Sequence, residues 1–428
     1  MRSRHTPLSL LIWLTLTLML TACGSGVSTP KESYAVAESK LSRDTAPAVD
    51  EGSLRRLAEA NNAFALSLLR ASAQHSDRNI LFSPYSISEI LAICYAGAAG
   101  ETKREMAEAL HFRLPDEKLH AAFDALDLHL NYRDANYTLD TANALWAQKG
   151  FSFSQPYLDR IKKNYGANIK LLDFTDGEAS RRIINRWIEA KTRQKIKNLI
   201  PPRTLSASTR LLLTNTLYFQ AQWERPFAER NTQTDLFYTE ADKTVEVPFM
   251  MRTDSYRYAE TEACQAVEIP YLDRRSSMVI LLPKESGYDD LLSQIDTLYP
   301  EVISAMHAAT VTLRMPKFSY TATLSGLKQY LQQAGMQRAF APDLADFSGM
   351  SDSAALYISD IMHKAYIDLD EKGTEAAAAT AVILSVTGLP SEVKEMKIDR
   401  PFLCFIRDLK SGQILFAGAV KIPEQRRE

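Results

Sequence analysis

The order in which helical and strand-like segments follow one another constrains the fold of this chain more than any other feature. From residue 51 the apolar residues of "LRRLAEANNAFALSLLRAS" recur at intervals of three and four, which is typical of amphipathic helices. Further helical patterns cover residues 178–199, 289–298 and 323–335, and strand-like runs cover residues 138–148, 210–223, 244–251, 265–271, 277–283 and 311–320. Helices come early, strands dominate late, and strand and helix do not alternate regularly. We therefore predict an α+β fold with mostly antiparallel sheets.

Two stretches carry sharper local signals. Residues 79–112, "NILFSPYSISEILAICYAGAAGETKREMAEALHF", predict a short buried strand, a Ser-Pro turn and an apolar helix that ends near Gly97–Gly100. A second helix, capped by Thr102, is expected to follow. Residues 400–423 hold two apolar runs joined at residues 410–412, "KSG", which predicts a β-hairpin.

Size and charge narrow the class of protein. The chain has 428 residues, 46% of them hydrophobic and 24% charged, which is enough to bury a large core. We see no internal repeat and no second linker, so one domain is predicted over residues 51–428. The formal net charge is -2, and basic pairs such as Arg181-Arg182 are scattered. This balance gives no reason to expect nucleic acid or a polyanion cofactor as a partner.

The N-terminus carries a targeting signal. Arg2 and Arg4 precede an apolar stretch, residues 7–20, that is short for a spanning helix. The following Leu-Thr-Ala-Cys resembles a bacterial lipobox, which implies a signal peptide over residues 1–22 and a lipidated, palmitate-bearing Cys23. Several acyl chains would anchor the protein stably to a membrane. Gly24 favours the outer membrane, so a bacterial lipoprotein is expected there.

Residues 23–50 are predicted to be the lipidated cysteine and a flexible tether. The stretch after Cys23 is rich in Ser, Thr, Ala, Gly and Pro and has no periodicity.

Motifs of catalysis and metal binding are missing from the sequence. It lacks G-x-S-x-G, H-E-x-x-H, a Walker loop and G-x-G-x-x-G, and its seven histidines lie in no metal-ligand spacing. Cys94, Cys264 and Cys404 are far apart and are interpreted as small buried hydrophobic residues. We therefore expect no metal, no cofactor and no enzyme activity, and favour a function based on binding or on conformational change.

The stretch "DEKGTEAAAATAVILSVTGLP", residues 370–390, fits neither an ordinary loop nor a core strand. It contains four successive alanines, and no side chain from Ala376 to Pro390 is charged. A surface loop is usually more polar, and a buried strand usually has larger and more branched side chains.

Taken together, the motifs of this chain resemble the serpin family over residues 52–424. Those that carry the resemblance, in family order, are residues 79–112 quoted above, "TNTLYFQAQWERPF" (214–227), "LRMPKFSYTATLSGLKQYLQQAGMQRAF" (313–340), "ADFSGM" (345–350), "HKAYIDLDEKGTEAAAATA" (363–381) and "DRPFLCFIRDLKSGQILFAGAV" (399–420). The resemblance implies three β-sheets, about nine helices and an exposed reactive loop at about residues 371–396. It also implies a protease inhibitor whose loop is cleaved and then inserts into the largest sheet.

The first part of this loop has the side chains that insertion requires. The hinge implied by the resemblance comprises Glu371, Gly373, Thr374, Glu375, Ala376, Ala377, Ala378 and Ala379. Thr374, Ala376, Ala378 and Thr380 share one parity, so one face of the inserted strand carries only small side chains. The hinge departs nowhere from the inhibitory pattern. The alternative is a non-inhibitory serpin acting as a surface binding protein, and a lipoprotein hydrolase is the least favoured.

The predicted position of the scissile bond depends on the residue from which the family's spacing is counted. The family's spacing from Glu371 places the cleaved residue at Thr387, with Gly388 after the bond. Counting back from Pro401 gives Pro390 instead, so the loop is about three residues longer than is common. We prefer the count from the hinge, because the length of the inserted strand decides where a trapped protease ends up. The bonds after Leu384 and Leu389 are the alternatives.

The loop also indicates a class of target. No Lys or Arg lies between Glu375 and Glu392, so a trypsin-like pocket has no basic side chain to bind. Elastase-like or subtilisin-like serine proteases are expected, and Val386 would also suit papain-like cysteine proteases. We expect the inhibitor to be a monomer that meets its target proteases while held at the membrane.

Five residues are implied to control opening of the sheet. Ser83, Ser86, Asn215 and His363 match a polar network where the central strands of the family part. Trp223 matches the residue beneath the point where the loop enters. His363, which lies between apolar residues and an alternating strand, is otherwise most simply a core histidine.

Overall fold

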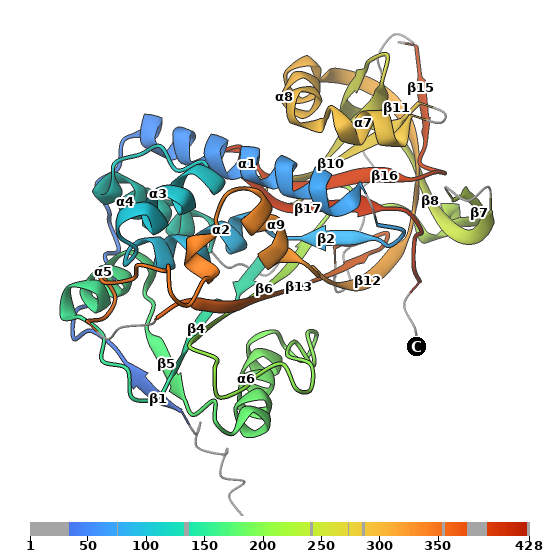
Figure 1. Cartoon of the computed structure of the whole chain (residues 1–428). Coiled ribbons are helices and arrows are strands. Elements are labelled where there is room, and N and C mark those ends of the chain that lie inside the picture. The colour runs from blue at the N-terminus through green and yellow to red at the C-terminus, as the bar shows by residue number, and fades with distance from the viewer. Residues whose placement is uncertain are drawn as a thin grey trace, which may run out of the picture. The chain divides into compact units, whose positions relative to one another are not determined.

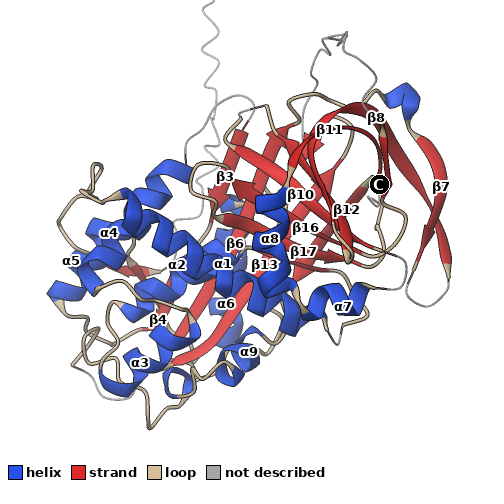
Figure 2. Ribbon diagram, turned by 90° about the horizontal axis from the view of Figure 1, so that it is seen from above, coloured by secondary structure: helices blue, strands red, loops and turns tan. Residues whose placement is uncertain are grey.

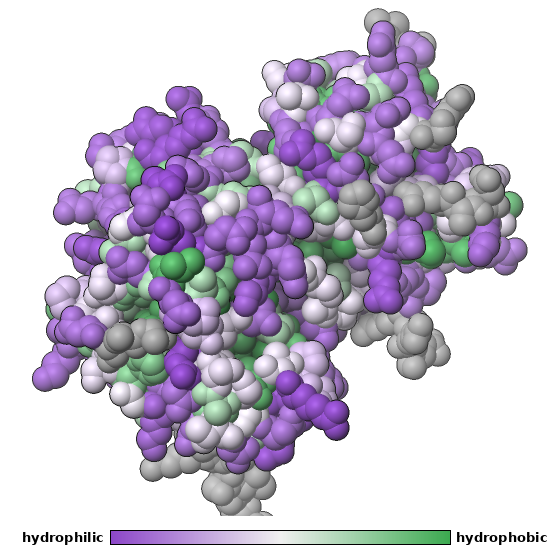
Figure 3. Space-filling model, in the orientation of Figure 1, coloured by the Kyte–Doolittle hydropathy of each residue, from purple (hydrophilic) through white to green (hydrophobic). Residues whose placement is uncertain are grey.

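Figure 1 shows the computed structural model, which describes residues 34–74, 76–131, 137–239, 243–272, 274–284, 287–352, 356–374 and 392–425. These residues belong to one compact unit that begins at Tyr34. None of the helices in these ranges combines the length and the hydrophobicity that crossing a bilayer requires. Hydrophilic residues cover most of the face seen in Figure 3, as expected for a surface in contact with water.

Nine α-helices occur in the described residues, most of them early in the chain as the sequence predicts. Many gather on one side of the molecule and strands on the other, as Figure 2 shows from above. The helices are α1 (Glu51–Ala73), α2 (Pro84–Tyr95), α3 (Gly100–Ala109), α4 (Asp116–Leu130), α5 (Gln155–Tyr165), α6 (Gly177–Lys191), α7 (Tyr288–Ser293), α8 (Ile295–Ala305) and α9 (Leu327–Gln333). Every residue of α2 is buried, which explains why its sequence is mostly apolar.

The sheet that contains Gly373 and Thr374, two residues of the predicted hinge, is called here the central sheet. Its strand order is β1 (Ala35–Ala37), β5 (Ile169–Leu172), β4 (Ala144–Gln148), β6 (Leu211–Gln222), β14 (Gly373–Thr374), β13 (Ile358–Leu369) and β12 (Phe318–Thr323), and β3 (Tyr137–Thr141) also pairs with β6. The predicted strand over residues 138–148 is thus divided into β3 and β4. Long strands β6 and β13 form the middle of the sheet and pair with each other directly in parallel.

The remaining strands form a second sheet. Its order is β15 (Lys394–Lys397), β11 (His307–Pro316), β8 (Thr244–Glu260), β9 (Cys264–Pro270), β10 (Ser276–Pro283), β16 (Phe402–Asp408), β17 (Ile414–Val420) and β2 (Ile80–Phe82), with β7 (Gln233–Tyr238) paired to β8. The three expected sheets are therefore two hydrogen-bonded networks in the described residues. The reason is β8, whose 17 residues pair with β7, β11 and β9 in turn and so join two sheets into one.

Of two local predictions, the C-terminal hairpin is confirmed and the helix cap at Thr102 is not. The hairpin over residues 400–423 is confirmed, since β16 and β17 pair antiparallel around Gly412. The prediction that Thr102 caps a helix is wrong. Thr102 lies inside α3, where its hydroxyl accepts a hydrogen bond of 2.9 Å from the Asp346 backbone N–H, and Ala99 is at the N-cap. This long-range contact is not visible in local sequence.

The structure also corrects the predicted boundary between the flexible tether and the folded body. Residues 34–50, expected to be flexible, pack against the folded body. β1 pairs antiparallel with β5, and Arg43 forms ion pairs with α4. The body therefore begins near Tyr34 rather than at residue 51. The predicted signal peptide, Cys23 and residues 24–33 lie outside the described residues.

Candidate functional site

The boundary between β6 and β13, called here the seam, is the centre of the candidate site. Along most of the seam the two strands pair directly, from Ile358 opposite Leu211 to Tyr366 opposite Tyr218. At one end β14 lies between them and is antiparallel to both. This end of the seam is called the hinge end. The sheet is thus already parted there and closed everywhere else.

A tight turn brings the chain back from β13 into β14. The backbone N–H of Asp370 donates to the carbonyl of Gly373 at 2.9 Å, and the Asp370 carboxylate accepts from the N–H groups of Lys372 and Gly373. Thr374 then lies opposite Ala221 on β6 and Leu369 on β13. In turns of this kind an aspartate side chain accepts hydrogen bonds from backbone N–H groups two or three residues later, so the turn is stabilised by local contacts.

Gly373 is needed because the backbone of β6 lies against it. A Cβ atom at this position would be 2.2 Å from the Ala221 carbonyl oxygen and 2.7 Å from the Cα of Gln222. No side chain fits in that space without moving backbone. The sequence suggested conformational freedom as the reason for this glycine, and the structure adds close approach between strands.

Thr374 is buried in a cluster of aromatic side chains. Its hydroxyl lies 2.8 Å from the hydroxyl of Tyr271. The ring of Tyr271 stacks on Trp223, with centroids 4.6 Å apart and planes 7° from parallel. The indole N–H of Trp223 donates to the carbonyl of Asp370 at 3.0 Å. Trp223 therefore lies beside the start of β14.

Glu371 fixes the turn through two side chains that the sequence did not single out. Its carboxylate accepts from the Thr232 hydroxyl at 2.7 Å and pairs with Lys317 at 2.8 Å. Burial raises the pKa of this carboxyl, but the hydrogen bonds from Lys317 and Thr232 outweigh burial and hold the pKa below its usual value. Glu371 is consequently charged and held in place at neutral pH.

Four predicted residues meet farther along the seam, where His363 on β13 is opposite Asn215 on β6. Nδ1 of His363 is bonded to the Asn215 side-chain oxygen, and its Nε2 accepts from the Ser83 backbone N–H at 3.1 Å. Because an N–H already points at Nε2, the proton of the neutral ring lies on Nδ1. Burial lowers the pKa of His363 to about 3, in agreement with a neutral ring.

Asn215 is bound from α2 and from a residue between β3 and β4. Its amide donates to the Ser86 hydroxyl and to the Asn143 side-chain oxygen. Ser86 also donates to Asn143 at 2.9 Å, and the Ser83 hydroxyl accepts from the N–H of Ser86 at 3.2 Å. Ser83, Ser86, Asn143, Asn215 and His363 are called the polar lock. Trp223 is not part of the lock and belongs to the hinge end.

Several predicted site residues lie outside the described residues. They are Cys23, Glu375, Ala376, Ala377, Ala378, Ala379, Leu384, Thr387, Gly388 and Leu389. Cys94, Cys264 and Cys404 are buried, and burial raises the pKa of each thiol, that of Cys404 to about 12. In the part of the chain that is described, no group of His, Cys, Asp and Glu side chains is arranged to hold a metal ion.

The fold is found again in known proteins. Residues 59–423 match the family described as Serpin (serine protease inhibitor). A serpin-like protein of Methanosarcina acetivorans is 36% identical over 374 residues, which are 86% of this chain and 86% of that protein.

Two solved structures extend the comparison. Serpin48, a highly specific serpin of the insect Tenebrio molitor, superimposes with a TM-score of 0.77 and 31% identity over 86% of this chain and 98% of that one. Human thyroxine-binding globulin in complex with thyroxine gives a TM-score of 0.80 and 30% identity over 87% of this chain and 100% of that one. The family match covers most of the chain, and the chain belongs to the serpin family.

Proposed function

We propose that this protein is a suicide-type protease inhibitor whose cleaved reactive loop inserts along the seam of the central sheet. The observation that carries the proposal is the position of β14. Gly373 and Thr374, the first residues of the predicted loop strand, are already hydrogen-bonded between β6 and β13. Insertion after cleavage would extend β14 along a path that the structure has begun.

The pairing geometry favours insertion energetically. Opening the seam removes one parallel ladder, and an inserted strand replaces it with two antiparallel ladders. Antiparallel pairing is slightly more stable per residue than parallel pairing. Each added hydrogen bond contributes about 0.5–1.5 kcal/mol net, so about a dozen residues contribute on the order of 10 kcal/mol together with burial of small apolar side chains. That energy would drag an acylated protease across the inhibitor before it deacylates.

The register of β14 predicts which loop residue reaches the polar lock. Thr374 is opposite Ala221 and Leu369, so an inserted strand in the same register would bring residue 380 level with Asn215 and with His363. Residue 380 is threonine. Its hydroxyl can both donate and accept, so it can replace the hydrogen bond that Asn215 and His363 lose when they separate.

The proposed targets follow from the loop sequence. Cleavage after Thr387 suits elastase-like or subtilisin-like serine proteases, and Val386 admits papain-like cysteine proteases.

The proposed site of action is the outer membrane, with Cys23 as the lipid anchor. These two assignments rest on sequence patterns at residues 1–24 and 376–390.

Incubation of the protein with an elastase tests the proposal directly. A denaturing gel should show a band near the summed mass of the two proteins, and mass spectrometry of the released C-terminal peptide should locate the cut after Thr387. Cleavage of the loop without any such band would contradict inhibition.

The alternative is a serpin that carries a ligand without inhibiting a protease. One solved relative, thyroxine-binding globulin, is observed in complex with thyroxine. The small side chains of the hinge favour inhibition, because a carrier does not need its loop to pass between strands. Cleavage without a stable complex would support the alternative.

A further inference from the structure

The segment from Tyr34 to Asp50, called here the strap, is tied to the central sheet and to the helices beside it. β1 adds a strand at the edge formed by β5, as Figure 1 shows, and pairs Val36 with Lys170. The Asp44 backbone N–H donates to the Lys163 carbonyl at 2.9 Å, and the Ser39 hydroxyl donates to Asp159. The strap is therefore docked at several points along its length.

The strap places one cation on two buried carboxylates. The Arg43 guanidinium lies 2.7 Å from Asp124 and 2.6 Å from Asp127, which are three residues apart on one face of α4. Both aspartates are almost completely buried. Removing one partner of a buried ion pair leaves an uncompensated charge in a medium that solvates it poorly. The two aspartates can therefore stay buried and charged only while Arg43 is docked against them.

A chain of hydrogen bonds leads from Asp127 toward the sheet. The hydroxyl of Tyr85 on α2 lies 3.2 Å from Asp127 and 3.3 Å from Glu89. This hydroxyl has a single proton, so it can donate to only one of the two carboxylates. Both contacts are full hydrogen bonds if one of the two carboxyl groups is protonated and donates to the Tyr85 oxygen. Burial raises the pKa of Glu89 well above its ordinary value, which supports the protonated form.

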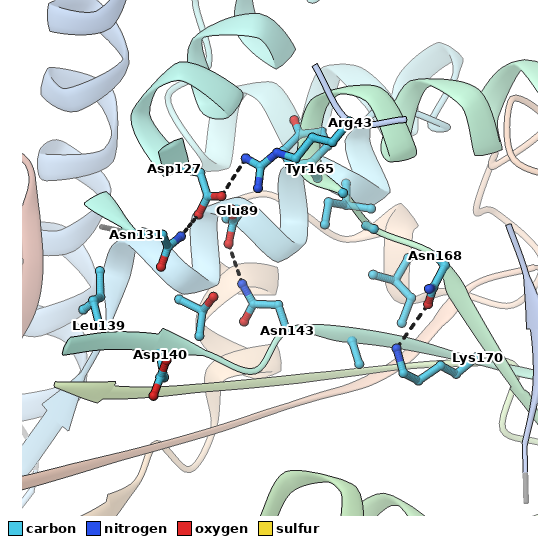
Figure 4. Close-up of a pocket in the computed structure, with 16 residues that line it drawn as sticks. Arg43, Glu89, Asp127, Asn131, Leu139, Asp140, Asn143, Tyr165, Asn168 and Lys170 are labelled. Atoms are coloured by element: carbon cyan, nitrogen blue, oxygen red, sulfur yellow. Dashed lines mark hydrogen bonds and ion pairs between the residues drawn. The ribbon is translucent and has the colours of Figure 1, made fainter. Parts of the chain in front are cut away.

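The same chain ends on the polar lock. The Asn143 amide donates to the second oxygen of Glu89 at 2.6 Å, and the other end of that amide group is bonded to Asn215 and Ser86. Figure 4 shows Arg43, Asp127, Glu89 and Asn143 around a polar cavity of about 360 Å³ beside β3 and β4. The strap and the seam are thereby joined by consecutive polar contacts.

We propose that Arg43 makes the strap a latch for the central sheet. While Arg43 is docked, the sequence of contacts through Asp127, Tyr85, Glu89 and Asn143 holds Asn215 in place against His363. When the strap leaves, the two aspartates lose their counter-charge, this chain rearranges, and the seam opens more readily. The functional consequence, faster insertion of the loop, rests on the proposed inhibitory function. In the proposed anchored protein, residues 24–33 would join the latch to the membrane.

Hydrogen exchange monitored by mass spectrometry tests the latch without any protease. Arg43→Met should accelerate exchange at least tenfold in peptides that cover β6 around Asn215 and β13 around His363. The matched control is Arg55→Met on the exposed side of α1, where the ion pair with Glu59 is loose at 3.7 Å. This control should leave exchange at the seam unchanged.

A second variant separates the charge effect from loss of packing. In Arg43→Met/Asp127→Asn one of the two uncompensated charges is removed, the one at the start of the hydrogen-bond chain to the polar lock, while Asp124 keeps its carboxyl group. The amide oxygen at position 127 can still accept from Tyr85. Exchange at the seam should return to within about threefold of the wild-type rate. Faster exchange confined to the strap in Arg43→Met, or no recovery in the double variant, would overturn the proposal. Trapping of elastase by the same proteins is measured separately, so failure of inhibition and failure of the latch give different results.

Discussion

The hinge end and the polar lock lie on the same seam but are held by different forces. At the hinge end β14 already separates the strands, and the turn is fixed by stacked rings and by the pair between Glu371 and Lys317. At the lock the strands touch, and the contact between Asn215 and His363 is a hydrogen bond. At the hinge end the size of a side chain determines whether it fits between the strands. At the polar lock, separation of the strands depends on breaking hydrogen bonds.

This difference suggests how a closed sheet can stay ready to open. A hydrogen bond can be exchanged for another at small net cost, but a bulky or charged side chain cannot enter a packed strand position cheaply. The seam would therefore open from the end that is already parted toward the end held by exchangeable contacts.

The largest expected effect comes from overfilling the hinge end. Thr374→Arg would place a charge in a buried site beside Tyr271, at a cost of several kcal/mol. Insertion should slow so much that the protease escapes, and the ratio of trapped to cleaved inhibitor should fall at least tenfold in a titration with elastase. Glu375→Arg, of opposite parity in the strand, is the control and should trap normally. Equal trapping by the two variants would contradict this account of the hinge.

A smaller effect is expected from acid at the polar lock. The native ring of His363 takes up a proton only near pH 3, whereas an unfolded histidine does so near its ordinary value of 6.5. The unfolded state therefore binds more protons between these values, so stability falls as the pH is lowered from about 6.5. The slope from this one group is at most ~1.4 kcal/mol per pH unit.

The urea midpoint of the uncut protein, measured from pH 7 to pH 5, checks this prediction. His363→Gln removes the titrating group while an amide can still bond to Asn215 and Ser83. The wild type should lose stability more steeply than the variant. Parallel curves would show that His363 does not titrate as its burial implies.

The smallest expected effect concerns the stability of the polar lock after the loop has been cleaved and inserted. Thr380→Val removes the hydroxyl that is predicted to reach Asn215 and His363 in the inserted strand. The cleaved form should lose about 1 kcal/mol and the uncut form nothing, as compared by thermal unfolding. Thr380→Ser restores the hydroxyl and should behave like the wild type. A loss of equal size in the uncut form would place Thr380 in some other contact.

The sequence supported some parts of this account better than others. The order of helices and strands predicted the α+β class, and the resemblance pointed to Asn215, His363, Ser83 and Ser86, which the fold brings together. Glu89 was detectable in principle, as the lone carboxylate in an apolar helix. Tyr271 and Lys317 were not, because their contacts join strands far apart in the chain.

The strap shows most clearly where sequence reasoning failed. Small and polar residues without periodicity are typical of a tether, and residues 34–50 were interpreted in that way. Their docking depends on pairing with β5 and on Arg43 reaching two aspartates some eighty residues later in the chain. Such long-range contacts leave no local pattern.

Thermal unfolding of the protein before and after a single cut in the reactive loop tests the central claim most directly. If the uncut fold stores free energy that strand insertion releases, the cleaved protein should unfold at a markedly higher temperature than the intact one. Identical unfolding temperatures would mean that no strand is added along the seam, and would contradict the proposed mechanism.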